Sequence, residues 1–187
     1  MKVTTTTLPG VLVLEPTMFT DARGFLYESF NQLAFNQATG LNETFVQDNI
    51  SRSGFNVLRG LHYQVQNPQG KLVQVIAGEV FDVAVDLRQS SARFGQWVGI
   101  TLSAVNRLQV WIPPGFAHGF LVTSACADVL YKTTQYYAPE HDRSVAWNDP
   151  SIGIQWPMQG QPVLSEKDSQ AGPLSNMEFT LPTAANW

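Results

Sequence analysis

Two histidines in short, strand-like segments are the first residues of this sequence that could do chemistry. They are His62, within residues 59–63, and His118, within residues 114–120. Small β-barrels that bind iron, manganese or zinc commonly use clustered histidines and carboxylates, often with two histidines at His-x-His spacing. Here Gln64 stands two residues after His62, and no carboxylate follows for several positions. The spacing therefore favours a metal-free site over a metal site.

Two basic residues could share a pocket with His62. Arg59 lies three residues before it, and Lys71 opens the next strand candidate after a turn at residues 67–70. We expect this turn to fold the Lys71 strand back along the His62 strand. Side chains alternate along a strand, so Arg59 and His62 would point to opposite faces unless a bulge near Gly60 adds a residue. A shared pocket therefore requires that bulge.

A tyrosine and an aspartate later in the chain are the other candidates for proton chemistry. Tyr131 lies in the strand candidate 129–134, where packing is the ordinary role of a tyrosine. Asp168 lies in the polar segment 164–168, which is typical of a solvated loop. A carboxylate that pairs with a histidine orients the ring and raises its basicity. Asp168 could do this for a histidine of the site.

Short strand-like runs separated by turn residues must position these side chains. Apolar and mixed positions alternate in the segments concerned, as in a strand with one buried face. The strand candidates are residues 25–30, 45–50, 57–64, 71–76, 79–87, 97–102, 109–112, 120–123 and 129–134. Only residues 31–39 have the pattern of a short helix, which Gly40 is placed to end. The pattern predicts an all-β sandwich or barrel with a few short peripheral helices.

Length and composition indicate one ordered domain spanning residues 1–187. Apolar residues make up 44 % of the chain and charged residues 14 %, which argues against disorder. A chain of 187 residues is long enough for one sizeable core but short for two domains. From about residue 150 the sequence is rich in Gly, Pro, Ser and Gln, so we expect this segment to wrap the barrel as loops and short helical turns.

Charge and cysteine content exclude several classes of protein. The formal net charge is −4 and the Lys and Arg residues are scattered, so the chain lacks the basic stripe of a nucleic-acid binder. The apolar run 11–14 ends at Glu15 and Pro16, too short for a signal core or a membrane span, which predicts a cytoplasmic protein. Cys126 is the only cysteine, which excludes an internal disulfide and a multi-cysteine metal site.

Several motifs together resemble those of a known family. The sequence Val-Leu-Arg-Gly-Leu-His-Tyr-Gln at 57–64, followed by Gln-Gly-Lys-Leu-Val at 69–73, resembles the signature of the dTDP-4-dehydrorhamnose 3,5-epimerase family. Further similar segments are residues 21–24, 47–49, 113–120, 131–132, 136–137, 147–150 and 164–168. The resemblance implies a cupin-type jelly-roll β-barrel, a homodimer, and neither metal nor other cofactor.

The resemblance also implies a reaction. The family epimerises dTDP-4-dehydro-6-deoxy-D-glucose at carbons 3 and 5 to dTDP-4-dehydro-L-rhamnose, through an enolate. This step belongs to dTDP-L-rhamnose biosynthesis, which supplies cell-surface polysaccharide such as lipopolysaccharide O-antigen. The expected partner is therefore a dTDP-linked keto-sugar, and neither nucleic acid nor membrane.

By matching position, the resemblance assigns roles to individual residues. His62 would be the general base, Tyr131 the general acid, Asp168 the partner of His62, and Lys71 the cation facing the carbonyl oxygen. The implied substrate contacts are Arg23, Glu28, Gln47, Asp48, Asn49, Arg59, Lys71, His118, Tyr137, Asp142 and Lys167. Among these, Tyr137 would stack on the thymine ring. The family often has a glutamate where this chain has Asp142, which reaches about one methylene less far.

Other functions remain open at this point. A relative that epimerises a single carbon, or a ketoisomerase of a related dTDP-keto-sugar, would share the fold and the base. A metal-dependent cupin would bind a transition metal. A noncatalytic sugar-nucleotide binding module would use His62 and Tyr131 only to line its pocket.

Overall fold

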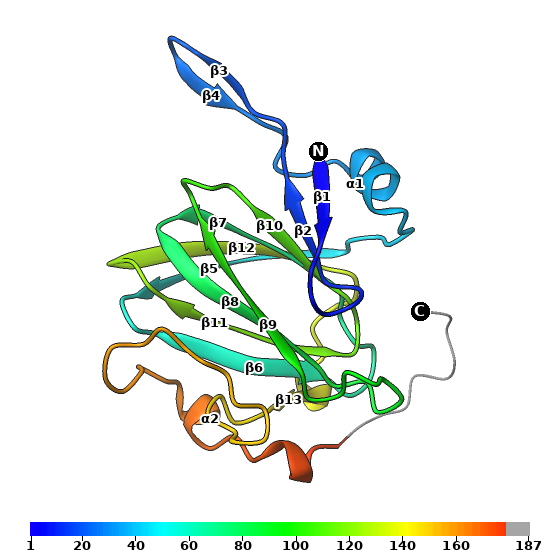
Figure 1. Ribbon diagram of the computed structural model, residues 1–187, viewed down its shortest axis with the longest axis vertical. Coiled ribbons are helices and arrows are strands. Elements are labelled where there is room, and N and C mark those ends of the chain that lie inside the picture. Colours follow the sequence, from blue (N-terminus) through cyan, green and yellow to red (C-terminus); the bar gives the residue numbers. More distant parts are fainter. Residues whose placement is uncertain (179–187) are drawn as a thin grey trace.

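The computed structural model describes residues 1–178, in which two antiparallel sheets pack face to face (Figure 1). The strands are β1 (Lys2–Thr5), β2 (Leu12–Glu15), β3 (Phe19–Asp21), β4 (Gly24–Leu26), β5 (Gln47–Gly54), β6 (Leu58–Gln64), β7 (Lys71–Ala77), β8 (Glu79–Asp86), β9 (Trp97–Ser103), β10 (Gln109–Ile112), β11 (Phe116–Val122), β12 (Cys126–Thr133) and β13 (Asp142–Ser144). One sheet has the order β1-β2-β10-β7-β12-β5 and the other β13-β6-β11-β8-β9. This cupin-like jelly roll confirms the predicted fold class.

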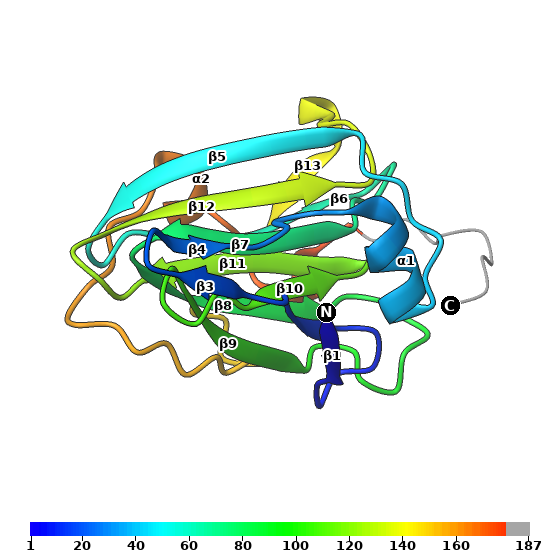
Figure 2. The ribbon, with the colours of Figure 1, turned by 90° about the horizontal axis from the view of Figure 1, so that it is seen from above.

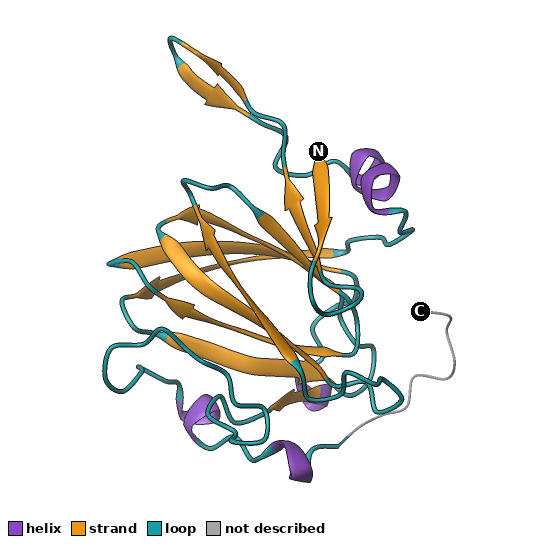
Figure 3. Cartoon of the chain, in the orientation of Figure 1, coloured by secondary structure: helices purple, strands orange, loops and turns teal. Residues whose placement is uncertain are grey.

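The helices are short and lie at the periphery (Figure 3). They are α1 (Gln32–Thr39), η1 (Pro139–His141), α2 (Glu166–Ser169) and η2 (Leu174–Asn176). The predicted helix is confirmed as α1: the Asn31 side chain accepts a hydrogen bond from the Ala34 amide, and Gly40 ends the helix with φ of 73°. No helix among residues 1–178 is long and apolar enough to cross a membrane.

Three apolar clusters hold the layers together. The first fills the space between the two sheets, where Val73 and Val129 of one sheet meet Val80 and Phe120 of the other. The second lies on the outer face of the five-stranded sheet, where Trp156 and other residues of the C-terminal segment pack. The third lies on the outer face of the six-stranded sheet under α1, and Figure 2 shows α1 at the side of that sheet. The five-stranded sheet is therefore covered on its outer face by the C-terminal segment, and the six-stranded sheet only in part, since Ile50 and Ile76 stay exposed.

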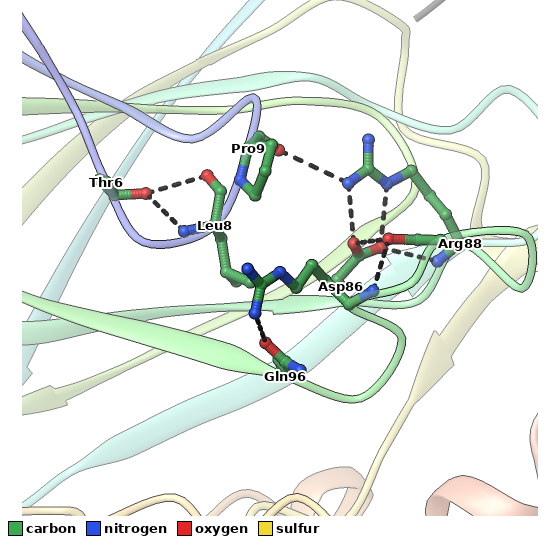
Figure 4. A network of polar contacts seen from close by, with 8 residues as sticks. Thr6, Leu8, Pro9, Asp86, Arg88 and Gln96 are labelled. Atoms are coloured by element: carbon green, nitrogen blue, oxygen red, sulfur yellow. Dashed lines mark hydrogen bonds and ion pairs between the residues drawn. The ribbon is translucent and has the colours of Figure 1, made fainter.

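A buried ion pair fixes one end of the five-stranded sheet (Figure 4). Asp86, which ends β8 and is fully buried, accepts hydrogen bonds from Arg88 and from the hydroxyl of Ser91. The guanidinium of Arg88 also lies 4.6 Å from the centroid of the Phe116 ring and contacts the carbonyl of Pro9. These contacts tie the loop after β1 to the end of β8.

The turn after β6 corrects one expectation. The turn was expected to fold the Lys71 strand back along the His62 strand, but β7 pairs with β10 and β12, whereas β6 pairs with β11 and β13. The amide of Gly70 is held by the Thr134 hydroxyl, so the turn carries the chain across to the other sheet. Lys71 therefore faces β6 across the interior instead of lying beside it.

Strand ends also differ from the predicted ranges. β4 stops at Leu26, before the predicted end at residue 30, and β5 begins at Gln47 and continues to Gly54. β11 begins at Phe116, four residues before the predicted start. Four strands were not predicted, because strands of three or four residues offer little alternation to recognise: β1, β2, β3 and β13.

Candidate active site

An irregularity in β6 sets the direction of the side chains in the site. His62 is paired with His118 and Arg59 with Phe120, so β6 has one more residue than β11 between these pairs. Leu58 and Leu61, three residues apart, consequently both pack in the outer-face cluster. This is the bulge that a shared face for Arg59 and His62 requires, and both side chains point between the sheets.

Two glycines allow β6 and β11 to approach closely at this bulge. Gly60 has φ of 126°, and a Cβ atom there would lie 2.5 Å from the Cα of Gly119. A Cβ atom on Gly119 would in turn lie 2.7 Å from the carbonyl oxygen of Arg59. Only glycine fits at both positions, and the contact brings the two paired histidines into register.

His62 is held by a buried carboxylate. Its Nε2 lies 2.5 Å from Oδ1 of Asp168, whose side chain is 3 % exposed. Burial raises the pKa of Asp168, but hydrogen bonds from His62, Ser165 and the Gly60 amide outweigh it, so the pKa lies below its ordinary value. Asp168 is therefore an acceptor, Nε2 carries the proton, and Nδ1 presents its lone pair. This arrangement suits a general base.

His118 forms a second histidine–aspartate pair. Its Nε2 lies 2.8 Å from Oδ2 of Asp82, and both side chains are almost fully buried. Burial lowers the pKa of His118 in spite of Asp82, and the nearby charges of Lys71 and His62 lower it further. A neutral imidazole is expected there near pH 7. It can exchange hydrogen bonds with a ligand without carrying charge.

Lys71 supplies a cation at the start of β7. Its removal from water lowers its pKa to about 8, which the negative charges of Asp142 and Asp82 partly oppose. Within residues 1–178, the Lys71 ammonium forms neither an ion pair nor a hydrogen bond. It is thus a charged donor, at neutral pH, that a ligand oxygen can use.

Tyr131 lies on β12 and packs against the apolar cluster between the sheets. Burial raises the pKa of its phenol, and the charge of Arg59 opposes the effect. The phenol therefore stays protonated near neutral pH, and among the described residues no hydrogen bond occupies its hydroxyl. A partly buried, protonated and unoccupied hydroxyl can donate a proton.

Asp142 joins three segments of the chain through its contacts with Tyr137 and Lys167. Oδ2 of Asp142 accepts a hydrogen bond from the Tyr137 hydroxyl at 3.0 Å and forms an ion pair with Lys167. Burial, together with this bond to Asp142, raises the pKa of Tyr137. The Tyr137 amide donates to Oε1 of Gln47, and the Gln47 amide group donates to Oδ1 of Asn49.

Most of the predicted site residues come together. Arg59, His62, Lys71, His118 and Tyr131 point between the sheets from four strands. His62 is paired with His118 in the strand register, the charges of Lys71 and His62 lower the pKa of His118, and the charge of Arg59 acts on Tyr131. Asp168 is joined to this group by its contact with His62. Hydrogen bonds and one ion pair link a second set of predicted residues to one another, and this set adjoins the group where Asn49 pairs with Tyr131 in the strand register and where Lys167 precedes Asp168: Gln47, Asn49, Tyr137, Asp142 and Lys167.

Three predicted substrate contacts do not join the cluster. Asp48 alternates with Gln47 and Asn49 along β5, so its side chain points to the outer face, where it pairs with Lys132 at 2.8 Å. Arg23 lies at the turn of the β3–β4 hairpin and pairs with Asp21, and Glu28 accepts from Asn31. Figure 1 shows this hairpin projecting from the end of the molecule opposite α2.

Two residues of the cluster were missed by the sequence reasoning. Asp82 lies within the strand candidate 79–87 but was not predicted as a site residue, although a carboxylate in a run of buried strand residues is itself a signal of pairing. Ser53 accepts a hydrogen bond from Nε of Arg59 at 2.9 Å. Among residues 1–178, no three His, Cys, Asp or Glu side chains are grouped so that they could hold a metal ion.

Comparison with known proteins gives consistent matches. The family model described as dTDP-4-dehydrorhamnose 3,5-epimerase matches residues 5–176. A protein of that description from Pseudomonas aeruginosa is 59 % identical over 170 residues, covering 91 % of this chain and 94 % of its own. The structure of dTDP-6-deoxy-D-glucose-3,5-epimerase from Legionella pneumophila, in complex with dTDP-4-keto-L-rhamnose, superposes with a TM-score of 0.93 at 51 % identity, covering 95 % and 94 % of the two chains.

A relative with a narrower activity has the same fold. A 3'-monoepimerase from Streptomyces bikiniensis, in complex with dTDP-quinovose, superposes with a TM-score of 0.85 at 33 % identity. The match covers 91 % of this chain and 86 % of that one. The fold is therefore shared by proteins that differ in how many carbons they epimerise.

Proposed function

This chain belongs to the dTDP-4-dehydrorhamnose 3,5-epimerase family, and we infer that it is an isomerase of dTDP-4-dehydro-6-deoxy-D-glucose. It epimerises carbons 3 and 5 and yields dTDP-4-dehydro-L-rhamnose, in dTDP-L-rhamnose biosynthesis. The observation that carries the residue assignment is the placement of a base and an acid on opposite sheets. His62, paired with Asp168, faces the interior from β6, and the Tyr131 hydroxyl faces it from β12.

This geometry suits inversion at a carbon beside a ketone. Nδ1 of His62 takes the proton, and the electron pair of the broken C–H bond forms an enolate with its charge on the carbonyl oxygen. Lys71 neutralises that charge, which develops mainly in the transition state. Tyr131 then delivers its proton to the carbon from the opposite side, and solvent restores the two side chains to their starting states. The same pair serves the second carbon when the sugar presents it.

Remaining polar groups would hold the nucleotide sugar. Arg59 and Lys167 carry the positive charge that a diphosphate requires, and the exposed ring of Tyr137 offers a face to thymine. Gln47 and Asn49 offer amide groups on the same side of β5. Binding energy from the nucleotide would position the sugar for proton transfer.

The β3–β4 hairpin supports the proposal of a homodimer. Phe19, Phe25 and Leu26 are 62 %, 57 % and 71 % exposed on this projecting hairpin, which is unusual for large apolar side chains. Arg23 lies at the turn of this hairpin, and Glu28 lies on the segment between β4 and α1, so neither joins the cluster of its own chain. If Arg23 and Glu28 contact the nucleotide, they would do so in the active site of the other subunit of the homodimer. Light scattering should give twice the monomer mass, and a monomer at micromolar concentration would contradict the proposal.

We also propose a cytoplasmic location. Cys126 is free and exposed, as suits a reducing compartment. Cell fractionation followed by immunodetection would check this.

Deuterium exchange tests the proposed reaction. The protein is incubated with dTDP-4-dehydro-6-deoxy-D-glucose in deuterated water, and NMR reads carbons 3 and 5 separately. Deuterium at both carbons, lost in His62→Ala and kept in the matched variant His141→Asn, supports a double epimerase with His62 as its base. Deuterium at one carbon indicates a single-position enzyme like the Streptomyces bikiniensis relative. No exchange at either carbon overturns the proposal.

A further inference from the structure

Asp142 links three parts of the chain around the cluster. Its carboxylate belongs to β13, the Tyr137 hydroxyl that it accepts from follows β12, and Lys167 belongs to α2. Both partners use the same oxygen, Oδ2. The Asp142 side chain is only 14 % exposed, so its ion pair is screened by solvent less than a surface pair.

α2 has little else to hold it in place. The helix spans Glu166–Ser169, which is far too short to be stable alone. Within residues 1–178, two side-chain pairs connect it to the strands: His62 with Asp168, and Asp142 with Lys167. Hydrogen bonds between main-chain groups anchor the chain outside the helix, at Val163 before it and at Gly172 after it, and the Gly60 amide of β6 donates to the carboxylate of Asp168.

Neighbouring residues of α2 make these two contacts. Lys167 and Asp168 are consecutive, so their Cα atoms are about 3.8 Å apart. A displacement of Lys167 must therefore be passed to Asp168 and to the orientation of the His62 ring. A catalytic group misplaced by about 1 Å can cost about 10²-fold in rate. The ion pair to Asp142 consequently bears on proton transfer, although Asp142 itself makes no contact with His62 among the described contacts.

We propose that Asp142 is a positioning residue, which holds α2 through Lys167 so that Asp168 stays on His62, and which joins this dyad to Tyr137. The sequence resemblance implied a substrate contact for Asp142 instead. Its Oδ2 is occupied by two protein donors, and its side chain is shorter than the glutamate often found in the family. The kinetic part of this inference rests on the proposed epimerase activity, but its structural part does not.

A double-mutant cycle distinguishes positioning from substrate contact. Asp142→Asn keeps the shape but removes the charge that holds Lys167, and we expect kcat to fall about 10- to 100-fold with a smaller change in KM. In an Asp168→Asn background, where the dyad is already lost, the same substitution should cost less than about 2-fold. If Asp142→Asn lowers kcat by the same factor in both backgrounds, or if it changes only KM, Asp142 acts on the substrate directly and the proposal is overturned.

NMR of the free enzyme provides a test without substrate. The Nε2–H resonance of His62, assigned by its loss in His62→Ala, is protected from exchange while Asp168 accepts it. Asp142→Asn should shift this resonance and speed its exchange, whereas Asp142→Glu, which keeps the charge, should preserve it. Tyr137→Phe is the matched control, because it removes the other bond to Oδ2 and leaves Lys167 in place. An unchanged resonance in Asp142→Asn would refute the positioning role even if the epimerase activity is as proposed.

Discussion

His62 and His118 occupy directly paired positions on β6 and β11, and each is held at Nε2 by a different aspartate. The two pairs differ in exposure: the His62 side chain is 33 % exposed and the His118 side chain 8 %. Burial lowers the pKa of His118. One face of two neighbouring strands thus carries an accessible imidazole for proton transfer and a buried neutral one for hydrogen bonding.

This difference predicts unequal losses of activity. His62→Ala removes the base and should lower kcat by about 10²- to 10⁴-fold. His118→Gln removes one hydrogen-bonding group and should cost clearly less in kcat. Steady-state kinetics with the sugar nucleotide measures both, and His141→Asn, which alters the remaining histidine, is the control. A larger loss in His118→Gln than in His62→Ala would exchange the two roles.

Lys71 predicts an alkaline limit to activity. Its pKa of about 8 means that the ammonium is charged below that pH and is lost above it, so kcat/KM should decline as pH rises through about 8. Lys71→Met should cost about 10²- to 10³-fold at neutral pH. Lys71→Arg should extend the activity to higher pH, because a guanidinium stays charged. Lys132→Met, on the outer face, is the matched control.

The same group predicts an opposite trend in stability. The pKa of Lys71 is about 8 in the folded protein and 10.5 in the reference state, so between these values the unfolded chain binds more protons. The contribution of Lys71 to the free energy of unfolding therefore rises with pH across this range. Denaturant titrations of wild type and Lys71→Met at pH 7.5 and at pH 10, an interval that contains most of this range, would measure the effect. We expect the free energies of unfolding of the two proteins to differ less at pH 10 than at pH 7.5. A constant difference would show that Lys71 does not titrate there.

Tyr131→Phe should separate proton removal from inversion. His62 and Lys71 are intact in this variant, so deuterium should still enter the substrate from the face of His62. Inversion should fall by about 10²-fold or more, because no acid stands on the other sheet. NMR of recovered substrate and product measures both quantities. Tyr136→Phe, which alters a tyrosine that is 68 % exposed, should behave as wild type, and equal loss of exchange and inversion in Tyr131→Phe would argue against a separate acid.

The contact between Gly60 and Gly119 predicts a stability effect. A methyl group at residue 119 would press on the backbone of β6, so Gly119→Ala should lower the free energy of unfolding by about 1–3 kcal/mol. Gly54→Ala is the control, since a Cβ atom there meets nothing within 4 Å, and it should change stability by less than about 0.5 kcal/mol. Urea denaturation measures both variants. Equal midpoints would show that the strands can separate without cost.

Local features of the site could be foreseen from the sequence, and long-range pairings could not. The need for a bulge between Arg59 and His62 follows from strand alternation alone, and the register bears it out. Alternation also predicts that the Asp48 side chain points away from those of Gln47 and Asn49. The family resemblance, which compares single positions, assigned all three residues to the substrate instead. The path of Lys71 into the other sheet depends on pairing with β10 and β12, far away in sequence, and no local pattern specifies it.

The bulge in β6 also supplies a hydrogen-bond donor, besides setting the direction of the side chains. Gly60 has no partner in the β11 register, and its amide N–H is directed to the carboxylate of Asp168. A chain without Gly60 would have an uninterrupted ladder, with Arg59 and His62 two positions apart and still on one face. What it would lack is the amide that helps to keep Asp168 ionised. The added residue therefore contributes a fixed main-chain donor to the dyad, which of the possible substitutions at residue 60 only proline would remove, since proline has no backbone N–H.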